Sequence, residues 1–153
     1  MTEIITVPDP RLREVSQPVG EIDTHVREVV SSLQDIVGKI VEIGHRQTIN
    51  IGLAAPQVGE LIRVFVIRLM GIEWVVINPR ILKETGHHFV DEYCESVPGH
   101  IFRVGRPKVI KMRGLSLDGL EHTFKGHDLL AAVLKHEYDH LDGILIDKKG
   151  ETK

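Results

Sequence analysis

The stretch DLLAAVLKHEYDHLDG, residues 128–143, decides how this chain folds. Its apolar residues recur every three or four positions, which is the spacing of one face of an α-helix; they are Leu130, Val133, Leu134, Tyr138 and Leu141. Asp128 stands where a side chain commonly caps the start of a helix, and Gly143 stands where a helix commonly ends. We therefore predict an amphipathic helix over residues 128–141.

The same helix carries the sequence His136-Glu137-Tyr138-Asp139-His140. Residues four apart lie one above the other on a helix, so His136 and His140 can bind a single metal ion. Glu137 is placed to accept a proton from a metal-bound water, whose pKa the metal lowers towards neutrality. A pair of solvated surface histidines is the alternative. The pattern favours a metal-dependent hydrolase.

An apolar strip continues the metal face of this helix. Leu129, Ala132 and Val133 stand seven, four and three residues before His136, so they share its side of the helix. An apolar strip beside a metal fits a substrate with a hydrophobic side chain next to its reacting group. For each of the three residues, membership of the protein core is the alternative.

A catalytic metal site needs a third protein ligand and an open coordination position. Downstream of His140 the chain offers carboxylates but no further histidine. The better candidate lies upstream and is Cys94, the only cysteine of the chain. A buried, unreactive thiol is the alternative. A single cysteine excludes an intrachain disulfide and fits a reducing compartment.

The remaining sequence predicts one further helix and several strands. Apolar residues recur at helical spacing over residues 24–44, with Asp23 or Thr24 as the N-cap and Gly44 as the end. Segments rich in β-branched residues and bounded by Gly or Pro predict strands at residues 61–68, 72–78, 89–92 and 108–113. This order of elements predicts an α+β fold with mostly antiparallel strands.

Length and composition fit one domain spanning residues 1–153. The 19 basic and 22 acidic residues are interspersed, which leaves no basic face for nucleic acid or for a membrane surface. The N-terminus lacks the basic and apolar regions of a signal peptide, and no apolar stretch approaches the roughly 18 residues of a membrane span. We expect a cytoplasmic protein.

Three segments, in this order and at this spacing, resemble the motifs of the peptide deformylases. They are Ile51-Gly52-Leu53-Ala54-Ala55-Pro56-Gln57, Cys94-Glu95-Ser96 and His136-Glu137-Tyr138-Asp139-His140. Enzymes of this family remove the N-formyl group from nascent bacterial and organellar polypeptides. The resemblance implies a peptide-deformylase-like fold, with mostly antiparallel sheets packed around the C-terminal helix. It also implies that a metal-bound water, assisted by Glu137, hydrolyses N-formylmethionyl peptides and releases formate.

The resemblance implies a role for each matching position. The metal, typically Fe(II) in the cell and often zinc or nickel in a purified sample, would be bound by Cys94, His136 and His140. The general acid–base would be Glu137, and the oxyanion hole would consist of the Gln57 side-chain amide and the Glu95 backbone N–H. The substrate backbone would pair with Ile51 and Gly52, and the methionine pocket would be lined by Leu129, Ala132 and Val133. The partners implied are N-formylmethionyl nascent peptides and the ribosome exit region.

Some positions depart from the usual motifs of the family. Asn50 replaces the first Gly of the first motif. The second motif is of the C-E-S type, with Tyr93 in place of the Gly common before the cysteine. Ile101 stands where an Arg is often found, which leaves Arg103 and Arg106 as candidates for its place. None of these departures removes a metal ligand or the acid–base.

Two other functions stay open on the sequence alone. The first is a peptidase or amidase with the same helix motif and unrelated substrates, which would not need Gln57 in its Ala-Ala-Pro-Gln context. The second is a deformylase-like binding module that holds metal without turnover, and Asn50 and Tyr93 are the features that favour it. Formate release from a formyl-Met peptide separates the three functions.

Overall fold

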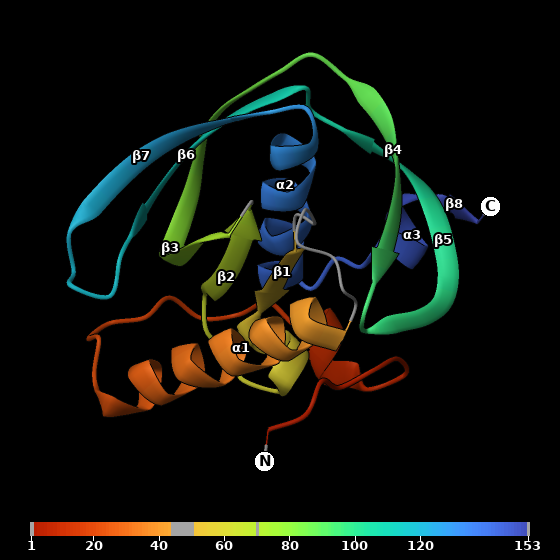
Figure 1. The fold of residues 1–153 in the computed structure, drawn as a ribbon. Coiled ribbons are helices and arrows are strands. Elements are labelled where there is room, and N and C mark those ends of the chain that lie inside the picture. The colour runs from red at the N-terminus through yellow and green to blue at the C-terminus, as the bar shows by residue number, and fades with distance from the viewer. Residues whose placement is uncertain (1, 44–50, 70, 153) are drawn as a thin grey trace.

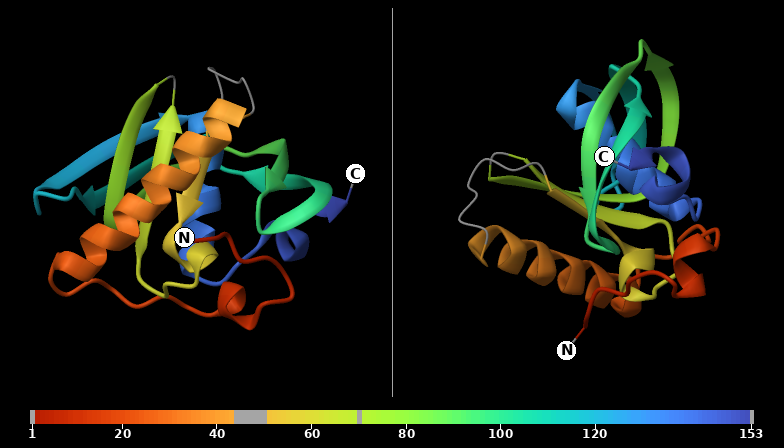
Figure 2. Two further views of the ribbon diagram at one scale, coloured as in Figure 1. Left: turned by 60° about the horizontal axis from the view of Figure 1, so that its bottom comes forward. Right: turned by 90° about the vertical axis from the view of Figure 1, so that its right-hand side faces the viewer.

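The computed structural model of the chain describes residues 2–43, 51–69 and 71–152. Its largest layer is a sheet with the strand order β1-β2-β3-β6-β7. Helix α1 packs against one face of this sheet and helix α2 against the other, and a second sheet of β4, β5 and β8 lies beside α2 (Figures 1 and 2). Neighbouring strands in both sheets are antiparallel. The predicted α+β class is confirmed.

The large sheet presents an apolar surface on each side. Its strands are β1 (Ile51–Ala54), β2 (Val64–Leu69), β3 (Ile72–Thr85), β6 (Val109–Leu115) and β7 (Glu121–His127). Because successive residues of a strand point to opposite faces, Leu53 and Val66 contact α1 while Phe65 and Ile67 contact α2. Strand β1 forms one edge of the sheet.

Helix α1 (Thr24–Ile43) begins where the sequence predicts. The Asp23 Oδ1 atom accepts a hydrogen bond from the Val26 N–H at 3.0 Å, so Asp23 caps the helix. The predicted end at Gly44 lies outside the described residues, as does Asn50. Like the other described helices, α1 does not combine the length and the apolarity needed to cross a membrane.

Helix α2 (Leu129–Leu141) follows β7 directly and carries the H-E-x-x-H residues. Asp128 has φ 51° and ψ −114°, and its side chain makes no capping hydrogen bond within the described chain, so the predicted cap is wrong. A capping side chain reaches the first turn from the β region, whereas here the Asp128 backbone N–H donates to Lys108 O at 2.8 Å. Gly143 ends the helix as predicted, at φ 72°, with its N–H 3.1 Å from His140 O.

The second sheet supports the strand that ends at the only cysteine. It contains β4 (His88–Cys94), β5 (Val97–Arg106) and the short β8 (Glu151–Thr152). A buried cluster joins Cys94 and Phe102 to Leu12 of η1 (Pro10–Arg13) and to Ile146 of α3 (Ile146–Lys149). Residues from both ends of the chain therefore pack around Cys94.

The sequence does not predict strands β1, β5 and β7. Strand β1 is only four residues long, β5 contains two glycines and a proline, and β7 is mostly polar. Strand β3 also continues past the predicted end at residue 78, through Pro79. The register between β3 and β6 shifts between Ile77 and Arg80, which lets the sheet accommodate a residue that has no N–H to donate.

Candidate active site

The two histidines of α2 and the cysteine at the end of β4 converge. The Nε2 atoms of His136 and His140 lie 3.2 Å apart, and Cys94 Sγ lies 3.4 Å from His140 Nε2. All three donor atoms lie within 4.8 Å of one another. The structure therefore brings together the three residues that the sequence nominates as metal ligands.

These separations fit the ligands of one tetrahedral ion. Donors about 2.0–2.3 Å from a zinc-type ion, set at tetrahedral angles, lie about 3.4–3.6 Å from one another. Thiolate and imidazole are ligands that such ions take. Burial lowers the pKa of His140 well below its ordinary value, which keeps the imidazole neutral and its lone pair available. The donor set fits a divalent metal ion.

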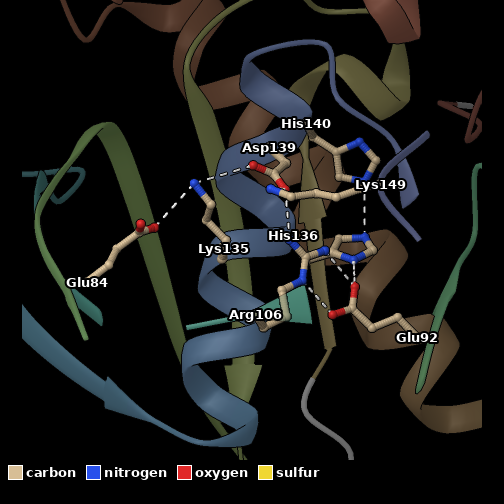
Figure 3. Close-up of polar contacts among 8 residues, drawn as sticks. All are labelled: Glu84, Glu92, Arg106, Lys135, His136, Asp139, His140 and Lys149. Carbon is tan, nitrogen blue, oxygen red and sulfur yellow. Dashed lines mark hydrogen bonds and ion pairs between the residues drawn. The ribbon is translucent and has the colours of Figure 1, made fainter. Parts of the chain in front are cut away.

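A buried carboxylate orients the first histidine (Figure 3). Glu92 Oε1 lies 2.7 Å from His136 Nδ1, so the opposite nitrogen of the ring is directed at the cluster. Arg106 donates to the same carboxylate from Nε and from Nη2, both at 2.7 Å. Burial raises the pKa of Glu92, but hydrogen bonds from Arg106 and His136 outweigh it and lower the pKa to about 2. Glu92 is therefore ionised at neutral pH.

Arg106 also joins the second sheet to α2. Its side chain is 1% exposed, and its Nη1 donates to Asp139 Oδ2 at 2.7 Å. Lys149 Nζ of α3 donates to the same oxygen at 2.8 Å, while Lys135 Nζ lies 3.7 Å from Asp139 Oδ1 and 3.3 Å from Glu84 Oε1 (Figure 3). The network therefore ties α2, which carries both histidines, to β5 and α3.

Glu137 has a different environment from Glu92. It is 3% exposed, burial raises its pKa to about 7, and its Oε1 has no hydrogen-bond partner among the described residues. A Cβ atom at Gly52 of β1 would lie 2.5 Å from Glu137 Oε2. Since such a contact is far too short, position 52 leaves room for the carboxylate only as glycine. The contact of Gly52 with Glu137 is not predicted by the sequence motif, which points to a role of this glycine towards the substrate.

Gln57 lies in η2 (Ala55–Val58), directly after β1. Its Oε1 accepts a hydrogen bond from the Ala54 N–H at 3.0 Å. Its Nε2 donates to Ser96 Oγ at 3.1 Å and lies 3.8 Å from Cys94 Sγ. The amide is therefore buried beside a candidate metal ligand. Glu95 lies in the turn between β4 and β5, is half-buried, and has the pKa of its carboxyl raised by burial.

The residues expected to contact substrate lie on two elements. Ile51 and Gly52 belong to β1, at the edge of the large sheet. On α2, Leu129 is 60% exposed and Ala132 is buried. Val133 is half-buried and packs against the core between α2 and the sheet, so a core role also fits it.

The two arginines considered for the missing Arg at position 101 have other partners. The donors of Arg106 are engaged inside the protein, so it does not take that place, and the expectation is wrong for this residue. The Arg103 guanidinium lies over the Phe89 ring, 5.2 Å from its centroid. Both Phe89 and Ile101 are exposed, so this pair lies on the outer side of β4 and β5.

Comparison with known proteins identifies the family. The sequence model of polypeptide deformylases matches residues 1–152. The peptide deformylase of Syntrophomonas wolfei is 41% identical over 152 residues, which is 99% of this chain and 95% of that protein. The peptide deformylase of Alkaliphilus metalliredigens is 42% identical over 146 residues, which is 95% and 94% of the two chains. The chain belongs to the peptide deformylase family.

The fold leads to the same family. The crystal structure of a peptide deformylase from Legionella pneumophila superposes with a TM-score of 0.87 at 31% identity, over 97% of this chain and 85% of that one. This chain is a metal-dependent hydrolase that removes the N-formyl group from nascent peptides. The family, fold and activity inferred from the three sequence motifs are confirmed, and a peptidase with unrelated substrates is excluded.

The sequence did not predict the roles of three residues around the deformylase site: Glu92, Arg106 and Asp139. Glu92 stands two positions before Cys94 and therefore on the same face of a strand, which is a signal that could have found it. Asp139 is a buried acid within an amphipathic helix, which is a second such signal. Arg106 gives none, because its partners lie 14 and 33 residues away in the chain.

Arg106→Leu should destabilise the deformylase strongly. It leaves Glu92 and Asp139 buried without their shared cation, which costs about 3–5 kcal/mol. Urea unfolding followed by circular dichroism measures the loss. Arg113→Leu is the matched control, because the ion pair of Arg113 with Glu121 is exposed and contributes about 0–1 kcal/mol. Equal losses for the two variants would contradict the importance given to Arg106.

Gly52→Ala should lower deformylase activity about a hundredfold while metal stays bound, because the added methyl group displaces Glu137. The measurements are kcat on a formyl-Met peptide and metal content by mass spectrometry. Gly38→Ala in α1 is the control: its added Cβ meets nothing within 4 Å, so activity should persist and stability should rise by about 0.5–1 kcal/mol. A wild-type kcat for Gly52→Ala would refute the steric argument.

Proposed function

We propose that Cys94, His136 and His140 hold one divalent metal ion and that Glu137 is the general acid–base of N-formyl hydrolysis. One observation carries the proposal: a sulfur and two imidazole nitrogens converge beside a buried carboxylate whose pKa is raised to about 7. The metal we propose is Fe(II) in the cell, with zinc or nickel taking its place in a purified sample. All three ions accept thiolate and imidazole ligands.

Glu137 moves the proton in this proposal. A bound metal ion supplies a Lewis acid for the formyl carbonyl and lowers the pKa of water. With a pKa near 7, the Glu137 carboxylate accepts a proton from the attacking water and returns it to the leaving amine. Its Oε1 has no partner among the described residues to compete for that proton. Glu92 is unsuited to the task, because Arg106 and His136 lower its pKa to about 2, which makes its carboxylate too weak a base.

Two N–H donors stabilise the oxyanion of the tetrahedral intermediate in this proposal. They are the Gln57 side-chain amide and the backbone N–H of Glu95. The amide is supported by its position, since Gln57 Nε2 lies 3.8 Å from Cys94 Sγ. Loss of one such donor costs about 3–4 kcal/mol of transition-state stabilisation. Any residue other than proline supplies the backbone donor, so Glu at position 95 can fill this role.

The substrate peptide adds to the edge of β1 as an extra strand in this proposal, paired with Ile51 and Gly52. Its methionine side chain enters an apolar pocket lined by Leu129, Ala132 and Val133. Leu129 supports this assignment, because a 60% exposed leucine on the metal-bearing helix gains most from being covered by an apolar ligand.

The setting we propose is the cytoplasm, near the ribosome exit region, where N-formylmethionyl nascent chains emerge. The free Cys94 thiol fits this compartment, because a reducing environment keeps both a thiolate and an Fe(II) ion reduced. Residues 1–153 act as one catalytic domain in this proposal. Ile5 and Val7, near the start of the chain, pack against the buried cluster that contains Ile146, near its end.

Glu137→Gln should abolish turnover and leave metal bound. The amide is nearly isosteric with the carboxylate but cannot accept the proton. Formate release and metal content, measured on the same preparation, test this, with Glu121→Gln as the control at an exposed carboxylate. Retention of more than about a tenth of wild-type activity would rule out the acid–base role, since general acid–base catalysis contributes about a hundredfold or more.

Hydrogen peroxide should inactivate the iron-loaded enzyme faster than the zinc-loaded enzyme. Fe(II) and its Cys94 ligand are both oxidisable, whereas zinc has no redox chemistry of its own. The half-lives of activity for the two anaerobically prepared forms test this, and catalase added before peroxide is the control. Equal half-lives would contradict the assignment of iron to Cys94.

A further inference from the structure

We propose that Ser96 is a positioning residue whose hydroxyl holds the Gln57 carboxamide in the orientation needed for oxyanion stabilisation; this rests on the role proposed above for Gln57. Ser96 lies in the tight turn between β4 and β5 and is 0% exposed. Its Oγ accepts a hydrogen bond from Gln57 Nε2 at 3.1 Å. The hydroxyl therefore contacts the same nitrogen that is to stabilise the oxyanion.

The orientation of the amide follows from contacts at both of its ends. The Ala54 N–H donates to Gln57 Oε1 at 3.0 Å, and Ser96 Oγ accepts from Nε2. A half-turn of the carboxamide would set its NH2 group against the Ala54 N–H, donor against donor. Ala54 therefore selects the orientation, and Ser96 fixes the end of the group that carries the hydrogens.

The two amide hydrogens of Gln57 have different acceptors. Gln57 Nε2 donates to Ser96 Oγ at 3.1 Å and to Cys94 Sγ at 3.8 Å. Sulfur is a weak acceptor, so an oxyanion that forms beside Cys94 can take over the second hydrogen. Ser96 then keeps the first hydrogen and holds the amide in place.

The N-terminal segment holds the backbones of both residues. The Ile5 N–H donates to Gln57 O at 2.7 Å, and the Val7 N–H donates to Ser96 O at 2.9 Å. Ile5 and Val7 therefore hold the backbones of Gln57 and Ser96 at a fixed distance from each other. The side-chain hydrogen bond between Gln57 and Ser96 joins parts that are already fixed, which is the condition for a preorganised donor.

A positioning role predicts a specific kinetic effect. Without the Ser96 hydroxyl, the Gln57 amide loses one of its two hydrogen-bond partners. The amide can then rotate so that its Nε2 no longer points at the oxyanion. An oxyanion exists in the transition state and not in the bound substrate, so kcat should fall while KM stays nearly constant. Ser96→Ala should lower kcat about tenfold and change KM by less than about twofold.

A double-mutant cycle isolates the action of Ser96 through Gln57. The four proteins are the wild-type enzyme, Ser96→Ala, Gln57→Leu and the double variant, all zinc-loaded. Ser96→Ala should lower kcat in the wild-type background and have an effect below about twofold in the Gln57→Leu background. Ser16→Ala is the matched control, because Ser16 is also buried and its Oγ has no hydrogen-bond partner within the described chain. The control should keep the wild-type kcat.

A spectroscopic measurement tests the hydrogen bond without relying on turnover. In the zinc-loaded protein labelled with 15N, one Gln57 side-chain N–H should exchange with solvent far more slowly than that of the exposed Gln17. Ser96→Ala should shift the Gln57 amide signals and abolish this protection, whereas Ser96→Thr, which keeps the hydroxyl, should restore it. Fast exchange in the wild-type protein overturns the inference even if Ser96→Ala fails to fold.

The kinetic outcomes separate this inference from the proposed function. If Gln57→Leu lowers kcat and Ser96→Ala does not, Ser96 does not position the Gln57 amide. The inference about Ser96 is then wrong, while the oxyanion role proposed for Gln57 stands. Equal effects of Ser96→Ala in both backgrounds also overturn it, because Ser96 would then act independently of Gln57. If Gln57→Leu itself keeps the wild-type kcat, the proposed oxyanion role of Gln57 falls and the inference falls with it.

Discussion

The buried guanidinium of Arg106 is the interaction on which the geometry of this site depends. It lies on β5 and binds Glu92 of β4 and Asp139 of α2 with hydrogen bonds of 2.7 Å. One partner therefore sits on the strand that ends at Cys94 and the other on the helix that carries both histidines. Taking these charges out of water is costly unless each is paired. The arrangement that pairs them also sets the distance across the candidate metal site.

The same network gives two buried glutamates different pKa values. Glu92 accepts hydrogen bonds from Arg106 and His136, which bring its pKa to about 2, so it stays charged and orients an imidazole. No donor among the described residues reaches Glu137 Oε1, and burial raises the pKa of Glu137 to about 7. Side chains of one chemical type thus differ in charge state because their surroundings separate their pKa values, and the proposed mechanism uses Glu137 as the proton carrier. Gly52 lies beside the Glu137 carboxylate and leaves space for it, because glycine has no side chain.

The parts of this structure that the sequence predicts are those that local periodicity specifies. Helices α1 and α2 repeat their apolar residues at helical spacing, and the His136–His140 pair follows from a fixed distance along one helix. Arg106 could not be found in this way, because its partners come from other elements and β5 is interrupted by glycine and proline. The cap expected of Asp128 fails for a related reason, since the strand leading into α2 imposes a positive φ on that residue.

The buried charges also account for where this chain departs from the usual deformylase motifs. Tyr93 and Ile101 are each 51% exposed, on the outer side of β4 and β5, and no described ion pair depends on them. At these two positions a change alters the exposed surface and leaves the pairing beneath it intact. The inward positions of the same strands carry Glu92, Cys94 and Arg106, where a change would leave a charge unpaired or remove a candidate ligand. In this hairpin, alternation along a strand separates exposed positions from positions that carry buried charges, because neighbouring residues face opposite sides.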